Sequence, residues 1–140
     1  IPELIKELLA TEGCLGVDAC RWSSGRQSIA AWFKDKSSAR RWYMNQAHQR
    51  VLRDHFEAAG IRGQGLEHVP DGAGPIFVIA TLTPSRTKSM ANIDLSLSQI
   101  SIELFAPLPG GMELGGRLSP AGFEVPHMHK IEPRPLEPTD

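Results

Sequence analysis

Hydrophobic residues recur with helical spacing at the start of the chain and again between residues 32 and 60. In Ile1 to Ala10 they lie at positions i, i+3, i+4, i+7 and i+8, the pattern of an amphipathic helix. Trp32 to Gly60 predicts the end of a strand and then one long helix, which Gly60 terminates. Three residues could cap the start of this helix, because their side-chain oxygens accept from the free amides of a first turn: Asp35, Ser37 and Ser38.

Alternating and continuous apolar runs predict strands in the remaining segments. Cys14 to Trp22 and Gln27 to Phe33 are expected to form a hairpin around a glycine-containing turn. Ile76 to Thr83 is almost continuously apolar, which predicts a central strand covered on both faces. Residues 99–104 alternate between polar and apolar, as in a half-buried strand, and Met112 to Leu118 is expected to return as an edge strand.

The order of these elements indicates an α+β domain with two layers. Two helices on one face of an antiparallel sheet correspond to a ferredoxin-like sandwich that lacks one strand at its front. Either that strand lies upstream of Ile1, or a strand from the C-terminal half fills its place. We expect residues 1–118 to form the domain and residues 119–140 to form a proline-rich C-terminal extension, extended over its last residues.

Charge and composition narrow the range of partners. The net charge of −1 over 140 residues provides no overall attraction to nucleic acid or to an anionic membrane. No apolar run approaches the roughly 18–20 residues that cross a bilayer, and no secretory leader is visible. Cys14 and Cys20 are expected on one strand face, too far apart for a disulfide. These features predict a cytoplasmic protein with reduced cysteines.

The long helix carries the polar residues that most resemble a functional site. His48 and His55 lie one heptad apart within its apolar face, and Asn45 lies at the edge of that face. A polar group there needs a hydrogen-bond partner or faces a cavity. Trp42 and Tyr43 fall towards the polar side of the same helix, which predicts partial exposure, a partner subunit or the rim of a pocket.

Two segments resemble antibiotic-biosynthesis-monooxygenase-type domains. One is the glycine turn at residues 12–16; the other is residues 32–39 followed by Trp42, Asn45 and His48. The resemblance implies ferredoxin-like subunits that pair as a dimeric α+β barrel, and therefore a homodimer. Domains of this kind include cofactor-free quinone-forming monooxygenases, haem-degrading monooxygenases and domains without known activity.

The resemblance leaves three functional hypotheses open. The first is a cofactor-independent monooxygenase that binds an aromatic or apolar small molecule between the sheet and the long helix, with His48 as acid/base and Asn45 beside it as catalytic residues. The residues expected to bind its substrate are Trp32, Trp42, Met44, Leu52 and His55. The second is a non-catalytic binding or assembly domain with structural histidines. The third is a haem-binding or haem-degrading protein, although Leu52 stands where the haem-degrading members place their iron ligand.

A metal site is not predicted. His127 and His129 have the i, i+2 spacing that could hold a divalent ion on an extended segment, but only with a further ligand from elsewhere. His48 and His55 would lie about 10–11 Å apart along a helix axis, too far for both to bind one ion.

Overall fold

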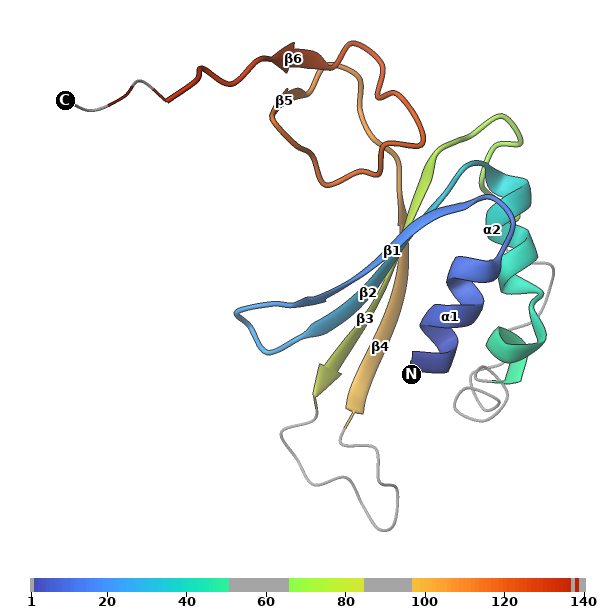
Figure 1. Ribbon diagram of the computed structural model, residues 1–140. Helices are drawn as coiled ribbons and strands as arrows, with labels where there is room; N and C mark the ends of the chain where they lie inside the picture. Colours follow the sequence, from blue (N-terminus) through green and yellow to red (C-terminus); the bar gives the residue numbers. More distant parts are fainter. Residues whose placement is uncertain (1, 51–65, 85–96, 137, 139–140) are drawn as a thin grey trace.

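Two helices and a four-stranded antiparallel sheet form two layers (Figure 1). The computed structural model describes residues 2–50, 66–84, 97–136 and 138. Both helices lie on one face of the sheet, which confirms the predicted α+β class and is compatible with a ferredoxin-like sandwich. The elements are α1 (Pro2–Ala10), β1 (Cys14–Arg21), β2 (Gln27–Phe33), α2 (Lys36–Tyr43), β3 (Ile76–Pro84) and β4 (Leu97–Phe105).

The strands lie in chain order across the sheet, β1-β2-β3-β4, and every neighbouring pair is antiparallel. The predicted hairpin is confirmed, with Val17 opposite Ala31 and Arg21 opposite Gln27. The predicted central position of the strand from Ile76 is confirmed too, because β3 pairs with β2 and β4. A strand from the second half of the chain therefore lies beside β2, as in one of the two alternatives predicted.

The hydrophobic core lies between the helices and the sheet. Alternate residues of β2 point into it, and Phe33 at the end of that strand is fully buried. Trp42 belongs to the same cluster and is 8% exposed, so the prediction that it lies towards the polar side was wrong. The buried core residues are Leu8, Ala31, Phe33, Ala39, Trp42 and Ile76.

The predicted single long helix is interrupted after its second turn. Its start is capped by Asp35, whose carboxylate accepts from the Ser38 amide at 2.8 Å and the Ser38 hydroxyl at 2.7 Å. These two bonds lower the pKa of Asp35, because they favour its charged form. The helix α2 ends at Tyr43, and residues 46–50 are helical again. Asn45 causes the break, since its side-chain oxygen accepts from the Ala47 amide at 2.7 Å and caps the second stretch.

An irregularity in β1 places the two cysteines on opposite faces of the sheet. The strand pairing shifts register between Cys14 and Gly16, as at a β-bulge. Cys14 therefore packs against the core, whereas Cys20 lies opposite Ser28 on the other face of the sheet. Both thiols are free, as predicted, but the expectation that they share one face was wrong.

The C-terminal segment lies at the upper end of the sheet, on the side away from the helices (Figure 1). Its two short strands, β5 (Met112–Leu114) and β6 (His129–Ile131), pair in parallel as a separate sheet. The predicted edge strand from Met112 therefore does not join the main sheet. The hydrogen bonds that fix this arrangement run from the Gly110 amide to Pro126 and from the His129 amide to Gly111.

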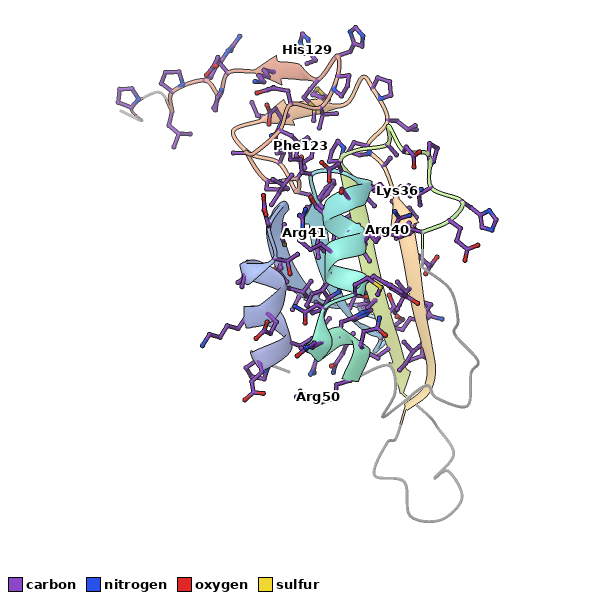
Figure 2. All side chains as sticks on the ribbon, turned by 90° about the vertical axis from the view of Figure 1, so that its right-hand side faces the viewer. Lys36, Arg40, Arg41, Arg50, Phe123 and His129 are labelled. Carbon is purple, nitrogen blue, oxygen red and sulfur yellow. The ribbon has the colours of Figure 1, made fainter. Side chains whose placement is uncertain are left out.

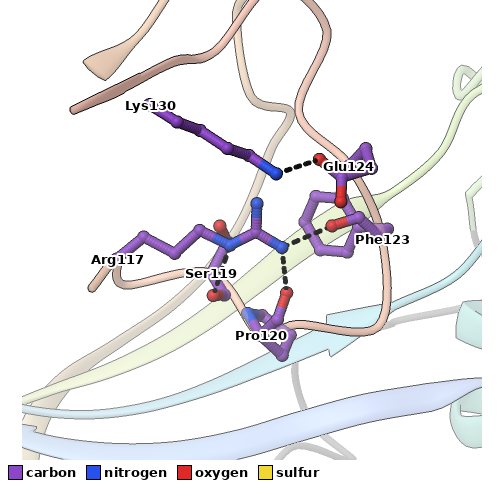
Figure 3. A network of polar contacts seen from close by, with 6 residues as sticks. All are labelled: Arg117, Ser119, Pro120, Phe123, Glu124 and Lys130. Carbon is purple, nitrogen blue, oxygen red and sulfur yellow. Dashed lines mark hydrogen bonds and ion pairs between the residues drawn. The ribbon is translucent and has the colours of Figure 1, made fainter. Parts of the chain in front are cut away.

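One arginine holds the loop between these short strands (Figure 3). The Arg117 guanidinium donates to the carbonyl oxygens of Ser119 at 3.2 Å, Pro120 at 2.8 Å and Phe123. It also lies 5.5 Å from the centre of the Phe123 ring. That ring in turn contacts Trp32, with 5.5 Å between ring centroids, so the loop covers the upper end of the open sheet face.

Candidate functional site

The structure brings Trp42, Tyr43 and His48 together around the interruption in the helix. The His48 ring lies 5.0 Å from the Trp42 ring and 5.7 Å from the Tyr43 ring, measured between centroids. Its Nδ1 is 3.1 Å from the Tyr43 carbonyl oxygen, which also accepts from the Gln49 side chain. These are contacts that hold the histidine against the core.

The hydrogen bond to Tyr43 fixes the tautomer of His48. A carbonyl oxygen can only accept, so Nδ1 carries the proton and Nε2 carries the lone pair when the ring is neutral. Burial lowers the pKa of His48 below its ordinary value, although the bond to the carbonyl acts in the opposite direction. At neutral pH the ring is therefore an uncharged base.

The other predicted site residues are divided between several places. Asn45 is close in sequence to His48, but its side-chain oxygen is occupied as a helix cap. Met44 is exposed. Trp32 is buried on the opposite face of the sheet, where its ring stacks on Phe77 at 4.2 Å between centroids. Leu52 and His55 lie outside the described residues.

We predict that His48→Ala lowers the free energy of unfolding by about 1–2 kcal/mol near neutral pH. The variant loses the ring contact with Trp42, while the Tyr43 carbonyl keeps its bond from Gln49 and is not left unsatisfied. Urea denaturation measures the difference, with Gln46→Ala as an exposed control in the same helical stretch.

The wild type and His48→Ala also test the lowered pKa of His48. The folded pKa of His48 lies below the unfolded value of about 6.5, so the unfolded chain binds more protons as the pH falls. The wild type should lose stability from about pH 6.5 downwards through the folded pKa. His48→Ala should lack this part of the pH dependence, and an unchanged pH dependence would contradict the assignment.

A groove of about 660 Å³ lies on the open face of the sheet, at the end away from Trp32 and the Phe123 ring that contacts it. Sequence inspection missed it, because its residues come from the hairpin turn and from two strands far along the chain. Only the strand register brings Thr81 of β3 next to Ser101 of β4. The groove is lined by Trp22, Ser24, Arg26, Thr81, Thr83, Ile100, Ser101 and Glu103.

Hydroxyl groups form a row across this part of the sheet. The Trp22 indole N–H donates to the Ser28 hydroxyl at 2.7 Å, and that hydroxyl shares a 2.8 Å hydrogen bond with Thr81. In β4, the Ser101 hydroxyl donates to a Glu103 carboxylate oxygen at 3.2 Å. Ser28 is buried beneath Trp22, whereas the indole itself remains 48% exposed.

The outer strand β4 carries an exposed apolar row. Ile100 is 37% exposed, Ile102 50% and Leu104 39%. The three side chains share the face that the helices cover, because Leu104 lies opposite Val78, which packs against the core. Phe105 is half-exposed at the end of the strand. A row of exposed apolar side chains along a terminal strand favours pairing with another strand.

Basic residues of α2 bind neighbouring loops (Figure 2). Lys36 is buried at the start of the helix, and its Nζ donates to Asp71 at 3.0 Å. The same hydrogen bond lowers the pKa of Asp71. Arg41 donates to the Glu12 carbonyl oxygen at 2.8 Å. These cations therefore connect α2 to the loops on either side of it, a structural role.

Metal-ligating side chains do not converge in the described part of the chain. Over residues 2–50, 66–84, 97–136 and 138, no three His, Cys, Asp or Glu side chains are grouped closely enough to hold an ion. His127 and His129 are both exposed in the C-terminal segment. Among the same residues, no helix has the length and apolar character needed to span a membrane.

The chain matches no protein-family model, no curated protein and no solved structure. The resemblance to antibiotic-biosynthesis-monooxygenase-type domains therefore stays a prediction based on residues 12–16 and 32–48.

Proposed function

We propose that this domain is a non-catalytic assembly domain, which pairs with a second copy of itself through the outer edge of β4. The observation that carries the proposal is the exposed row of Ile100, Ile102 and Leu104. Burying these half-exposed side chains would contribute roughly 3 kcal/mol per copy. Backbone hydrogen bonds between the two edges would add to this.

The edge of β4 has few of the features that protect terminal strands. Within the described residues β4 pairs only with β3, and it extends over Leu97–Phe105. Protected edges usually carry lysine, proline or inward-pointing charges. Here the charged residue is Glu103, which points to the face opposite the apolar row. Such an edge is suited to extension by another strand.

The sequence of β4 is self-complementary about Ile102. In an antiparallel pair centred on this residue, Ile100 lies opposite Leu104 of the second copy, and Ile102 meets its own counterpart. On the other face Glu103 lies opposite Ser101, so no like charges face each other directly. The exposed row would become continuous across the two-fold axis.

Edge pairing is favoured over the face-to-face barrel that the family resemblance implies. A barrel would bury the open face of each sheet against the other sheet. The chain's own Phe123 already contacts Trp32 on this face, and Pro120 approaches Gly16. A sheet extended through β4 would leave this covering loop in place.

Light scattering tests the proposal on the whole chain. The expected mass is about twice the 15.4 kDa of one chain at micromolar concentration. A mass of one chain up to the highest soluble concentration would contradict assembly by this domain.

A small-molecule monooxygenase is the second candidate, and the neutral His48 supports it. With Nδ1 bonded to Tyr43, Nε2 could accept a proton from a phenolic substrate beside Trp42. On this hypothesis the protein consumes oxygen with such a substrate, and His48→Ala reduces turnover by on the order of 10²–10⁴-fold. Absence of oxygen consumption would remove the hypothesis, and a Soret band in the purified protein would favour the haem-binding alternative.

A further inference from the structure

The groove on the open sheet face has the features of a binding site, and three of its lining residues, Ile100, Ser101 and Glu103, belong to β4. Its volume of about 660 Å³ lies within the usual range for small-ligand sites. Edge pairing extends a sheet in its own plane, so a second copy would add a strand beside the groove without covering the sheet face that it lies on. Its lining combines one aromatic ring with hydroxyl and charged groups.

Trp22 is anchored at its indole N–H, although about half of the residue is exposed to solvent. Its N–H bond to Ser28 is 2.7 Å long, and Ser28 is only 3% exposed, so the anchor is buried. Thr81 supports this anchor through its own bond to Ser28. An indole in a fixed orientation with an exposed flat surface can stack on a ligand with little loss of side-chain entropy.

The polar groups around Trp22 are balanced in charge. Arg26 supplies up to five hydrogen-bond donors, and the Glu103 carboxylate accepts from Ser101 and retains further lone pairs. Thr81 and Ser101 add hydroxyls that can both donate and accept. One cation and one anion give no excess charge to attract a phosphate or an ammonium group. The lining therefore fits an uncharged ligand with many hydroxyl groups.

We propose that this groove binds a saccharide. One face of a pyranose ring presents aliphatic C–H groups, which stack on the flat indole surface of Trp22. The hydroxyl groups at the ring edge then lie near three polar side chains of the groove. Arg26 can donate hydrogen bonds to them, Glu103 can accept, and Thr81 can do both. A planar apolar ligand would stack on the indole but make no use of these polar groups.

NMR titration of the whole chain with cellobiose, maltose, lactose and chitobiose tests the proposal. Three tryptophans give three indole N–H signals, and the Trp22→Phe variant identifies the one of Trp22. We expect at least one disaccharide to shift this signal with a millimolar dissociation constant, while the signals of the buried Trp32 and Trp42 stay in place.

Two variants separate binding from folding. Trp22→Ala should abolish the shifts of the β3 and β4 amides, and the near-isosteric Glu103→Gln should weaken binding about tenfold without changing the melting temperature. Leu108→Ala, an exposed site outside the groove, should bind like the wild type. The proposal is overturned if none of the four disaccharides shifts the Trp22 signal, or if both groove variants bind like the wild type. The mass measurement on the wild-type chain tests the pairing of β4 separately, and a failure of saccharide binding would leave its result unchanged.

Discussion

Gly13→Ala is expected to lower the free energy of unfolding by about 3 kcal/mol or more. Gly13 joins α1 to β1 with φ +88°, a conformation that an L-residue adopts at a loss of roughly 1–2 kcal/mol. A methyl group there would lie 1.8 Å from Ser38 Oγ and 2.4 Å from Ser38 Cβ. Rotation of the Ser38 side chain cannot relieve an overlap that includes its Cβ, so the turn and α2 would have to separate.

The turn cannot move away without breaking other bonds. The Gly13 carbonyl oxygen accepts from the Lys34 amide at 2.8 Å, directly before the Asp35 cap of α2. Ser38 is itself bonded to Asp35 through its amide and its hydroxyl. The overlap would therefore strain the start of α2 and the end of β2 together.

A second glycine with nearly the same backbone angle is the matched control. Gly25 in the hairpin turn has φ +90°, and a methyl group there would meet no atom within 4 Å. Gly25→Ala should therefore lower the free energy of unfolding only by the cost of the positive φ, about 1–2 kcal/mol. Denaturation in urea measures both variants. The double variant Gly13→Ala/Ser38→Gly should recover part of the stability that Gly13→Ala loses. Equal decreases in the free energy of unfolding for Gly13→Ala and Gly25→Ala would contradict a role for the contact with Ser38.

The sequence predicted the helices and strands that depend on residues close together in the chain. The strands of the main sheet follow from short-range apolar patterns. The sequence also limited the helix cap to three residues, Asp35, Ser37 and Ser38, of which Asp35 is the cap in the structure. The long helix was predicted as continuous because hydrophobic spacing alone favours it. Asn45 interrupts it, because its side-chain oxygen accepts a hydrogen bond from the Ala47 amide. Trp42, in the last turn of α2, is buried, whereas Met44 at the C-cap is exposed.

Features that depend on distant partners could not be predicted. The bulge at Cys14 follows from the pairing of β1 with β2, and it reverses the face of one cysteine. The groove requires the register of β3 with β4 in addition to the hairpin. Arg117 looks like a surface charge in the sequence, because its partners are backbone carbonyl oxygens. Of the predicted site, His48 and Trp42 do meet, but in contacts that also suit a structural histidine.

Ile102→Lys is expected to dissociate the dimer at concentrations where the wild type is paired. In a strand pair centred on this residue, the two introduced ammonium groups would face each other across the axis and lose hydration. We expect the dissociation constant to rise by on the order of 100-fold or more, which corresponds to about 2.7 kcal/mol. The folded monomer should change in stability by less than about 0.5 kcal/mol, because half of the side chain is already exposed.

Leu136→Lys is the control for added charge. Leu136 is 98% exposed, so the same substitution alters the net charge without touching β4. Light scattering over a concentration series should give the wild-type mass for this variant and the mass of one chain for Ile102→Lys. Equal masses for both variants would place the interface elsewhere.

Disulfide formation at residue 102 tests pairing through β4 most directly. The native thiols are first removed as Cys14→Ala and Cys20→Ser, and Ile102→Cys is then introduced into that protein. Because the two copies of this residue meet at the proposed axis, mild oxidation should convert most of the protein into a covalent dimer. Ser24→Cys, in the exposed hairpin turn, should form little intermolecular disulfide under the same conditions, although its chains still pair through β4. Similar slow cross-linking at both positions would contradict pairing through β4.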